Sequence, residues 1–361
     1  MVMMLVRRGT SCWYSSAGLL QLLCTVLTLQ EVHATPDDVS RSPDTTTSRS
    51  DTTTSRSSTT PDETAVDRCP DVVINGSGSC NCSSLLTEIR CRDLTAVPQF
   101  RPDGASYSAV YLDQQRITSL PSYSAVYLDK QRITSLPAAA FRNLSASRIV
   151  LNFNPIGDRL SELALRGLET SVRELELGRC ALAQLPETLL NGMSRLRRLH
   201  LWANHIRLIP GGFFGGADAL RELHLWGNEL EELDALSLGG LWNLRRLDLD
   251  RNRLAAVGKD AFRHLLELHS LRLNDNRVEA LYAETFVYME SLKTLSLERN
   301  RINYVHEKAF VGLSTLLSLS LSGNRITYLP NELFVPLRNL IVLRLDSNRI
   351  EYIWPGTFIG Q

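Results

Sequence analysis

The feature that most constrains this chain is a 24-residue unit that repeats without a slip between residues 172 and 361. Two adjacent copies are LRRLHLWANHIRLIPGGFFGGADA from Leu196 and LRELHLWGNELEELDALSLGGLWN from Leu220. Each copy contains an L-x-L pair, then a polar residue three positions after the second leucine and an apolar residue thirteen positions after it. Such regularity predicts a stack of equivalent coils that bury one continuous core.

Three columns of residues define the interior of the predicted stack. The second leucines are Leu177, Leu201, Leu225, Leu249, Leu273, Leu297, Leu321 and Leu345. The polar column is Cys180, Asn204, Asn228, Asn252, Asn276, Asn300, Asn324 and Asn348, and the apolar column is Leu190, Phe214, Leu238, Phe262, Phe286, Phe310, Phe334 and Phe358. The period of two in L-x-L predicts short strands with inward leucines, paired between coils into a parallel sheet.

The polar column falls where the chain turns away from the sheet. An amide has two donors and an acceptor, so a stack of asparagines satisfies the backbone groups that these turns leave unpaired. Cys180 occupies the first of these positions, and we expect a buried thiol there in place of the amide. The apolar column fills the core on the return, convex side of each coil.

The pattern L-x-x-L-x-L-x-x-N/C-x-L is that of the leucine-rich repeat. We therefore predict an α/β solenoid, a horseshoe with a parallel concave β-sheet, over residues 106–361. Residues 106–121 and 122–137 are near-identical tandem copies that differ only at Gln114 and Lys130. Since each copy is too short for a full coil, we read them as a recent duplication or a gene-model error, and we expect one copy to stack poorly.

Residues 1–66 have a different composition. Residues 1–34 resemble a secretory signal peptide, with Arg7 and Arg8 before an apolar run and a cleavage position after Ala34. The alternative is an uncleaved signal anchor. Residues 35–66 contain DTTTSRS twice and have almost no large apolar side chains, so we predict a disordered Ser/Thr-rich linker with the composition of an O-glycosylated stalk.

Four of the seven cysteines follow in residues 67–98, at Cys69, Cys80, Cys82 and Cys91. In a secreted chain this spacing indicates two disulfides, for which the sequence alone allows three pairings. Zinc sites prefer paired C-x2-4-C ligands, which are absent here. A disulfide-capped N-terminus would cover the open core and the sheet edge of the first coil.

The cysteine cluster followed by the repeats resembles extracellular leucine-rich repeat proteins with a cysteine-rich N-terminal flank. This class includes Slit, the acid-labile subunit of the insulin-like growth factor complex, Toll-like receptors and variable lymphocyte receptors. The resemblance covers nearly everything from Cys69 onward and implies the pairs Cys69–Cys82 and Cys80–Cys91. Sequons at Asn75, Asn81 and Asn143 would be glycosylated in a secreted or cell-surface chain.

Candidate binding residues are the outward side chains of the strands, since a solenoid presents variable residues on its concave face. One outward column, Glu174, Arg198, Glu222 and Arg246, alternates acid and base across four coils, so that neighbours can pair. Two others place Trp202 beside Trp226 and His200 beside His224. Exposed tryptophans are enriched at interface hot spots, so we predict an aromatic ligand platform with Arg198 and Arg246 within reach. The alternatives are a plain surface charge ladder and two indoles that merely cover each other.

The charge balance, 39 basic against 39 acidic residues, gives no indication of a nucleic-acid partner or a polybasic membrane patch. No nucleophile with an ordered base, no phosphate loop and no third ligand for a metal beside the two histidines can be identified, so we expect neither an enzyme nor a cofactor. We predict an extracellular module that binds a protein or glycoprotein on its concave face. The alternative is a structural matrix or carrier protein, or the non-catalytic subunit of a secreted complex.

The sequence stops at Gln361 inside a repeat, without a cysteine cap. We therefore expect a fragment, in which any membrane attachment would come from a missing C-terminal segment.

Overall fold

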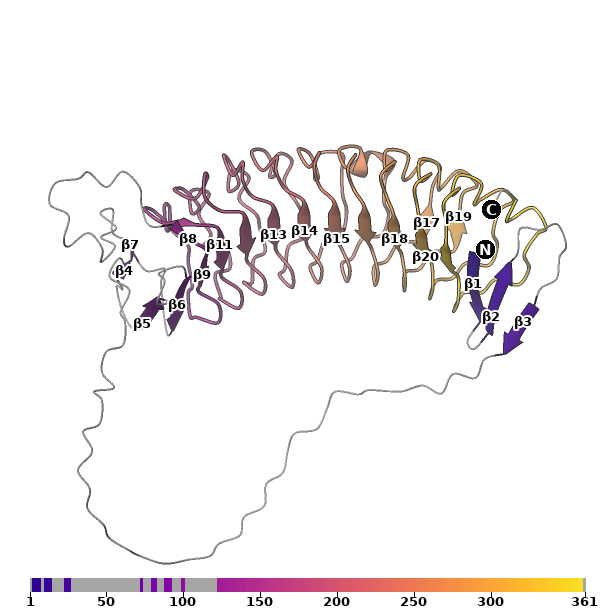
Figure 1. Ribbon diagram of the computed structural model, residues 1–361, viewed down its shortest axis with the longest axis horizontal. Coiled ribbons are helices and arrows are strands. Elements are labelled where there is room, and N and C mark those ends of the chain that lie inside the picture. Colours follow the sequence, from indigo (N-terminus) through magenta and orange to yellow (C-terminus); the bar gives the residue numbers. More distant parts are fainter. Residues whose placement is uncertain are drawn as a thin grey trace, which may run out of the picture.

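The computed structural model describes residues 122–359 and, ahead of them, the backbone of seven short strands. Its coils stack side by side in one long arch (Figure 1). Each coil supplies one three-residue strand, and the remainder of the coil returns through turns with little regular structure. The predicted leucine-rich repeat solenoid is confirmed.

One parallel sheet runs through all the coils. Its strands are β9 (Ala125–Tyr127), β11 (Arg148–Val150), β12 (Glu174–Glu176), β13 (Arg198–His200), β14 (Glu222–His224), β15 (Arg246–Asp248), β16 (Ser270–Arg272), β18 (Thr294–Ser296), β20 (Ser318–Ser320) and β21 (Val342–Arg344). From β12 onward, residues that face each other on neighbouring strands are 24 positions apart. The sequence repeat therefore sets the register directly.

The sheet continues beyond the coils at both ends, to fifteen strands in all. At the start, β6 (Glu88–Arg92) pairs in parallel with β9, and β5 (Ser79–Cys82) pairs antiparallel with β6, which places Cys80 opposite Cys91 in the register. At the other end, β1 (Val2–Arg7) pairs with β21 and is followed by β2 (Thr10–Tyr14) and β3 (Leu23–Val26).

Smaller pairings lie outside the long sheet. They are β4 (Val72–Val73) with β7 (Gln99–Phe100), β8 (Ser122–Tyr123) with β10 (Ser145–Ala146), and β17 (Ala280–Leu281) with β19 (Tyr304–Val305). A 3-10 helix, η2, spans Lys259–Phe262 on the return side of its coil.

Several predictions fall where the structure describes no side chains and at most a few short strands of backbone. They are the signal peptide, the linker, the two cap disulfides, the sequons at Asn75 and Asn81, and residues 106–121, the first of the tandem copies. The second copy supplies β9, which pairs directly with β6. Asn143 does lie in the described part, half-buried in a turn with φ of 66°.

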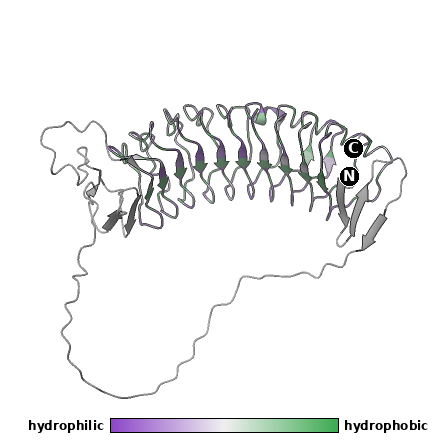
Figure 2. Ribbon diagram, in the orientation of Figure 1, coloured by the Kyte–Doolittle hydropathy of each residue, from purple (hydrophilic) through white to green (hydrophobic). Residues whose placement is uncertain are grey.

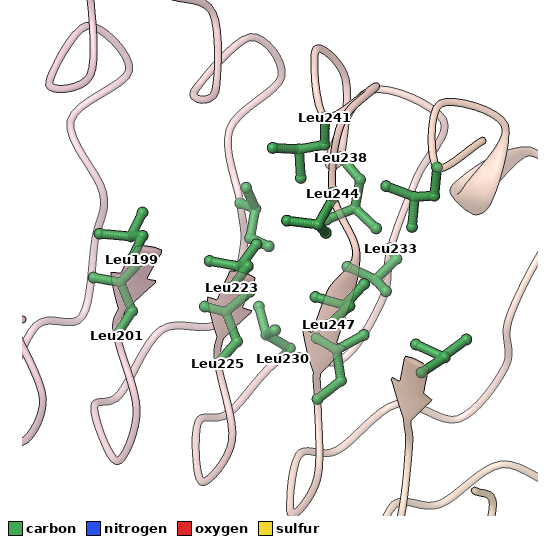
Figure 3. Close-up of a cluster of buried hydrophobic side chains, with 14 of the residues drawn as sticks. Leu199, Leu201, Leu223, Leu225, Leu230, Leu233, Leu238, Leu241, Leu244 and Leu247 are labelled. Atoms are coloured by element: carbon green, nitrogen blue, oxygen red, sulfur yellow. The ribbon is translucent and has the colours of Figure 1, made fainter. Parts of the chain in front are cut away.

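The core consists of the predicted leucine and phenylalanine columns. Figure 3 shows Leu199, Leu223 and Leu247 turned inward from successive strands, and each is at most 1% exposed. On the return side, the rings of Phe262, Phe286, Phe310, Phe334 and Phe358 stack at centroid distances of 6.1, 6.5, 6.1 and 5.4 Å. Figure 2 shows the hydrophobic residues recurring from coil to coil. Each fully buried leucine stabilises the fold by about 1.5–3 kcal/mol.

The asparagine column forms the predicted ladder. Nδ2 of Asn228 donates to the carbonyls of Leu201 and Leu225, both at 2.9 Å, and its Oδ1 accepts from the backbone N–H of Ile206 at 3.2 Å. The same three bonds recur at Asn252, Asn276, Asn300, Asn324 and Asn348. One amide therefore satisfies a carbonyl of its own coil and two backbone groups of the preceding coil.

Cys180 is buried in this ladder, as predicted. Its Sγ lies 3.3 Å from the carbonyl oxygen of Leu151 and so replaces only part of what an amide supplies. Burial raises the pKa of the thiol to about 12, which keeps it protonated at neutral pH.

Candidate binding face

The outward residues of the strands lie in the columns that the repeat predicts. In the register of β12 to β15, Glu174 faces Arg198, Arg198 faces Glu222, and Glu222 faces Arg246. We call the outward surface of this sheet the concave face. It carries three different kinds of contact between coils: ion pairs, stacked rings and a polar ladder.

The ion pairs occupy the alternating column. Nη2 of Arg198 lies 2.7 Å from Oε2 of Glu174, and Nη1 of Arg246 lies 3.0 Å from Oε1 of Glu222. Arg148, one coil earlier, extends the column because it pairs with both Glu176 and Glu174. The predicted pairing of acid with base is thus confirmed, and Arg198 and Arg246 are partly neutralised within the sheet. The most exposed of these pairs, Arg246 with Glu222, contributes about 0–1 kcal/mol.

His200 and His224 stack in parallel beside this column, with ring centroids 4.7 Å apart and an interplanar angle of 5°. Burial lowers the pKa of His200, and the neighbouring His224 lowers it further. Its Nε2 lies 3.4 Å from Oε1 of Glu174 but makes no hydrogen bond there. The two stacked rings form a partly covered support on this part of the face. Among residues 122–359, no group of three His, Cys, Asp or Glu side chains could hold a metal ion.

Trp202 and Trp226 stack at the carboxyl end of the same strands, as predicted. Their ring centroids are 5.3 Å apart and their planes differ by 2°. Trp202 also lies directly on Gly178, because a Cβ added there would be 2.2 Å from Cε2 of the indole. The edge of Phe153 closes the row at 5.7 Å and 74°, and this ring is 40% exposed. We call Phe153, Trp202 and Trp226 the aromatic shelf.

Two cations flank the free side of the shelf. Nζ of Lys130 lies 5.7 Å from the ring centroid of Phe153, and Cζ of Arg179 lies 5.5 Å from it. These are cation–π distances, worth about 0.5–1 kcal/mol at exposed sites. Sequence reasoning identified the tryptophans but missed all three of these residues. The available signal was Phe153 itself, an aromatic side chain two residues after Leu151 in a coil that is 26 residues long instead of 24.

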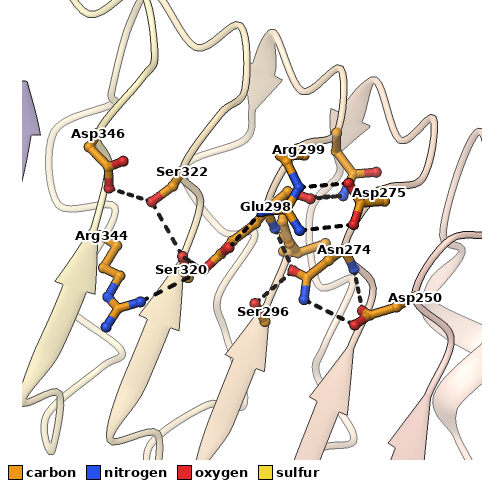
Figure 4. A network of polar contacts seen from close by, with 12 residues as sticks. Asp250, Asn274, Asp275, Ser296, Glu298, Arg299, Ser320, Ser322, Arg344 and Asp346 are labelled. Carbon is orange, nitrogen blue, oxygen red and sulfur yellow. Dashed lines mark hydrogen bonds and ion pairs between the residues drawn. The ribbon is translucent and has the colours of Figure 1, made fainter. Parts of the chain in front are cut away.

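The later coils carry a polar ladder in the column that contains the tryptophans. Asp250 accepts from Nε and Nη2 of Arg272 at 2.8 and 2.5 Å, and from the backbone N–H of Asn274 at 2.7 Å. Oδ1 of Asn274 in turn accepts from the backbone N–H of Glu298 at 2.8 Å. Figure 4 shows how the network continues through Ser320 and Ser322 to Asp346.

The aromatic shelf interrupts this ladder. In the earlier coils Oδ1 of Asn152 accepts from the backbone N–H of Gly178 at 2.7 Å, so the ladder begins there as well. At the next two positions, the residue before Trp202 in this column is Gly178 and the residue before Trp226 is Trp202. Neither glycine nor an indole has a side-chain acceptor for the backbone N–H that follows it. The shelf thus combines exposed ring surface with two backbone donors that the column leaves without a side-chain partner.

Comparison with known families gives one match. The model of the family described as Leucine rich repeat matches residues 170–230, 194–254, 218–278, 242–302, 266–326 and 314–360. Together these matches cover more than half of the chain. None of the curated proteins compared matches it in sequence.

Solved structures with the same fold come from varied settings. A complex of TLR13 with single-stranded RNA aligns with a TM-score of 0.58 at 24% identity, over 64% of this chain and 33% of that one. A leucine-rich repeat protein of Leptospira interrogans aligns with a TM-score of 0.53 at 27% identity, over 62% and 54%. The octameric complex of Latrophilin 3, Unc5D and the FLRT2 repeats gives 0.55 at 24%, over 74% and 83%. The chain thus spans a third of the TLR13 chain and about half of the bacterial one.

None of the helical segments within the described residues has the length and apolar character needed to cross a bilayer.

Proposed function

Since the chain belongs to the leucine-rich repeat family, we propose that it is an extracellular recognition module whose concave face binds a protein or glycoprotein. The aromatic shelf forms the centre of that contact. The remaining outward columns form its polar rim. The single observation that carries the proposal is the pair of half-buried indoles stacked on the concave face beside an exposed phenylalanine ring.

The shelf has the composition and setting of a binding hot spot. Tryptophan carries a disproportionate share of interface energy, and hot spots lie among polar contacts that exclude water. Here the shelf is flanked by Lys130 and Arg179 on one side and by the polar column beginning at Asp250 on the other. The stacked geometry also restricts the rings before a ligand arrives, which lowers the entropic cost of binding.

The leader, the sequons and the cysteine cluster taken together support the extracellular setting. Solved structures of the same fold support a binding role, since the FLRT2 repeats were solved in a complex with Latrophilin 3 and Unc5D, and TLR13 in a complex with single-stranded RNA. A module of this kind acts by presenting a rigid surface, and no catalytic step is part of the proposal.

The test is a binding screen followed by substitution. The secreted chain is screened against an array of recombinant extracellular domains, and each hit is measured again with the Trp202→Ala/Trp226→Ala variant. We expect that variant to weaken binding by about 2–4 kcal/mol, a 30- to 1,000-fold rise in Kd.

A matched control uses the same sheet face away from the shelf. Thr294→Ala/Ser318→Ala changes two outward residues of β18 and β20 and should leave Kd within about twofold. If both variants bind as the wild type does, the shelf is not the hot spot, and a distributed matrix or carrier role replaces the proposal.

A further inference from the structure

A column of basic residues stands immediately before the strands. The residue that precedes each strand from β12 to β18 is basic in six consecutive coils: Arg173, Arg197, Arg221, Arg245, His269 and Lys293. The four arginines and Lys293 are exposed. We call this set the basic column. It borders the concave face at the end opposite the aromatic shelf.

The backbone holds the members of this column side by side. The N–H of Arg197 donates to the carbonyl of Arg173 at 2.8 Å, that of Arg221 to Arg197 at 2.8 Å, and that of Arg245 to Arg221 at 2.8 Å. His269 and Lys293 continue the series, each with a bond of 2.9 Å to the member before it. With strands about 4.8 Å apart, the six positions form a line about 24 Å long.

The column is not neutralised by the protein. Within the described residues, no carboxylate lies within 4.0 Å of the side-chain nitrogens of Arg173, Arg197, Arg221, Arg245 or Lys293. The adjacent outward column, one residue further along each strand, alternates glutamate with arginine and pairs internally. Like charges on neighbouring strands destabilise a sheet, so the basic column has a cost that the alternating column avoids.

We propose that the basic column is a binding site for a linear sulfated polysaccharide. Such a chain carries anionic groups at short, regular intervals along a stiff line, which matches a straight row of cations on a rigid sheet edge. The planar guanidinium forks of the arginines suit the oxygens of sulfate and carboxylate groups. This site is separate from the protein-binding role of the shelf and does not depend on it.

The surroundings favour a polysaccharide over a nucleic acid. Single strands are held by aromatic side chains that stack on successive bases between the cations. No Phe, Tyr or Trp stands in the basic column, and the stacked tryptophans lie beyond the opposite end of the strands. The expected secretory route also brings the chain to the compartment where sulfated polysaccharides occur.

The experiment measures binding of the full chain to immobilised heparin, a sulfated polysaccharide, at increasing salt. The test variant is Arg173→Ser/Arg197→Ser/Arg221→Ser/Arg245→Ser. The control, Arg166→Ser/Arg195→Ser/Arg263→Ser/Arg338→Ser, removes the same charge from exposed turn positions that do not recur at a fixed spacing and so form no row. Thermal unfolding establishes that both variants are folded.

We expect the test variant to bind heparin about tenfold or more weakly and the control to stay within about threefold of the wild type. Equal weakening in both variants would mean that net charge alone drives the interaction, and the proposal would be wrong. It would also be overturned if the wild type failed to bind heparin, if desulfated heparin bound equally well, or if single-stranded polyuridylate bound more tightly than heparin.

Discussion

The two halves of the concave face share one backbone but not one chemistry. Both have the inward leucine column and polar and return-side columns that differ only at Cys180, Leu190 and Leu238, and the strands keep the same register. Yet one outward column carries stacked indoles at Trp202 and Trp226 and a hydrogen-bonded ladder from Asp250 onward. The comparison teaches that the outward column is free to vary, because the inward columns already hold the coils together.

The difference also separates two ways of linking coils. In the polar half Asp250 and Asn274 each accept a backbone N–H from the next coil, and Glu298 and Asp346 accept from serine hydroxyls, so these side chains contribute to the scaffold. In the aromatic half ring contacts replace those bonds and leave apolar surface facing solvent. A side chain whose polar atoms are already bonded within the sheet is less available to a ligand, whereas the rings of the shelf expose apolar surface that a ligand can cover.

The largest effect should come from breaking the polar half at Asp250. Asp250→Ala removes the acceptor of the Asn274 N–H and leaves Arg272 without its closest carboxylate, and the side chain of Asp250 is only 9% exposed. We expect a loss of about 2–4 kcal/mol in the free energy of unfolding, measured by urea denaturation. Asp346→Ala is the matched control: within the described residues the carboxylate of Asp346 accepts only from Ser322, so its loss should cost less than about 1 kcal/mol. Equal losses at both positions would contradict the assigned role of Asp250.

The next largest effect should come from a substitution beneath the aromatic shelf. In Gly178→Ala the added methyl overlaps the indole of Trp202, which must leave its stack on Trp226. We expect a cost of about 1–3 kcal/mol and the loss of the near-ultraviolet circular dichroism of the coupled indoles. Gly258→Ala is the control, because nothing lies within 4 Å of a Cβ there and its φ of −78° suits any residue. An unchanged spectrum for Gly178→Ala would contradict the packing of the shelf.

A smaller effect concerns the pH dependence of the free energy of unfolding, through His200. Burial, reinforced by His224, lowers the pKa of His200, so the unfolded chain binds a proton at this site more readily than the folded one. Stability therefore rises with pH from the folded pKa up to the unfolded value near 6.5, and is lost on acidification through the same window. His200→Gln should flatten that slope in urea titrations between pH 7.5 and 5.5. An identical slope in the variant would contradict the shift.

The sequence predicted the scaffold because its period fixes which residues meet. Residues one repeat apart must face each other, so the inward leucines, the asparagine ladder, the ion pair of Arg198 with Glu174 and the stack of Trp202 on Trp226 all follow from counting.

The contacts that the repeat period did not predict involve residues outside the regular columns or side chains that could bind more than one partner. Phe153 joins the shelf from an irregular coil, and no spacing rule assigns it to Trp202. The cations on Phe153 depend on side-chain conformations that the column does not specify. Predicting the polar ladder would require knowing that a backbone N–H of one coil points at a side chain of the coil before it.

The smallest effect concerns the irregular rung of the asparagine ladder at Cys180, which lies beside the shelf. Cys180→Asn should add a donor and an acceptor where the thiol makes a weak contact with the carbonyl of Leu151, raising stability by about 1 kcal/mol. Asn228→Cys, the reverse exchange in a regular coil, should lower it by more, because three bonds of the amide are lost. In the wild type, the pKa of about 12 predicts that Cys180 resists alkylation at pH 8 until the chain unfolds. If Cys180→Asn destabilised the protein, the coil before it would lack the backbone groups that an amide needs, and the thiol would be a requirement of that coil rather than a tolerated substitute.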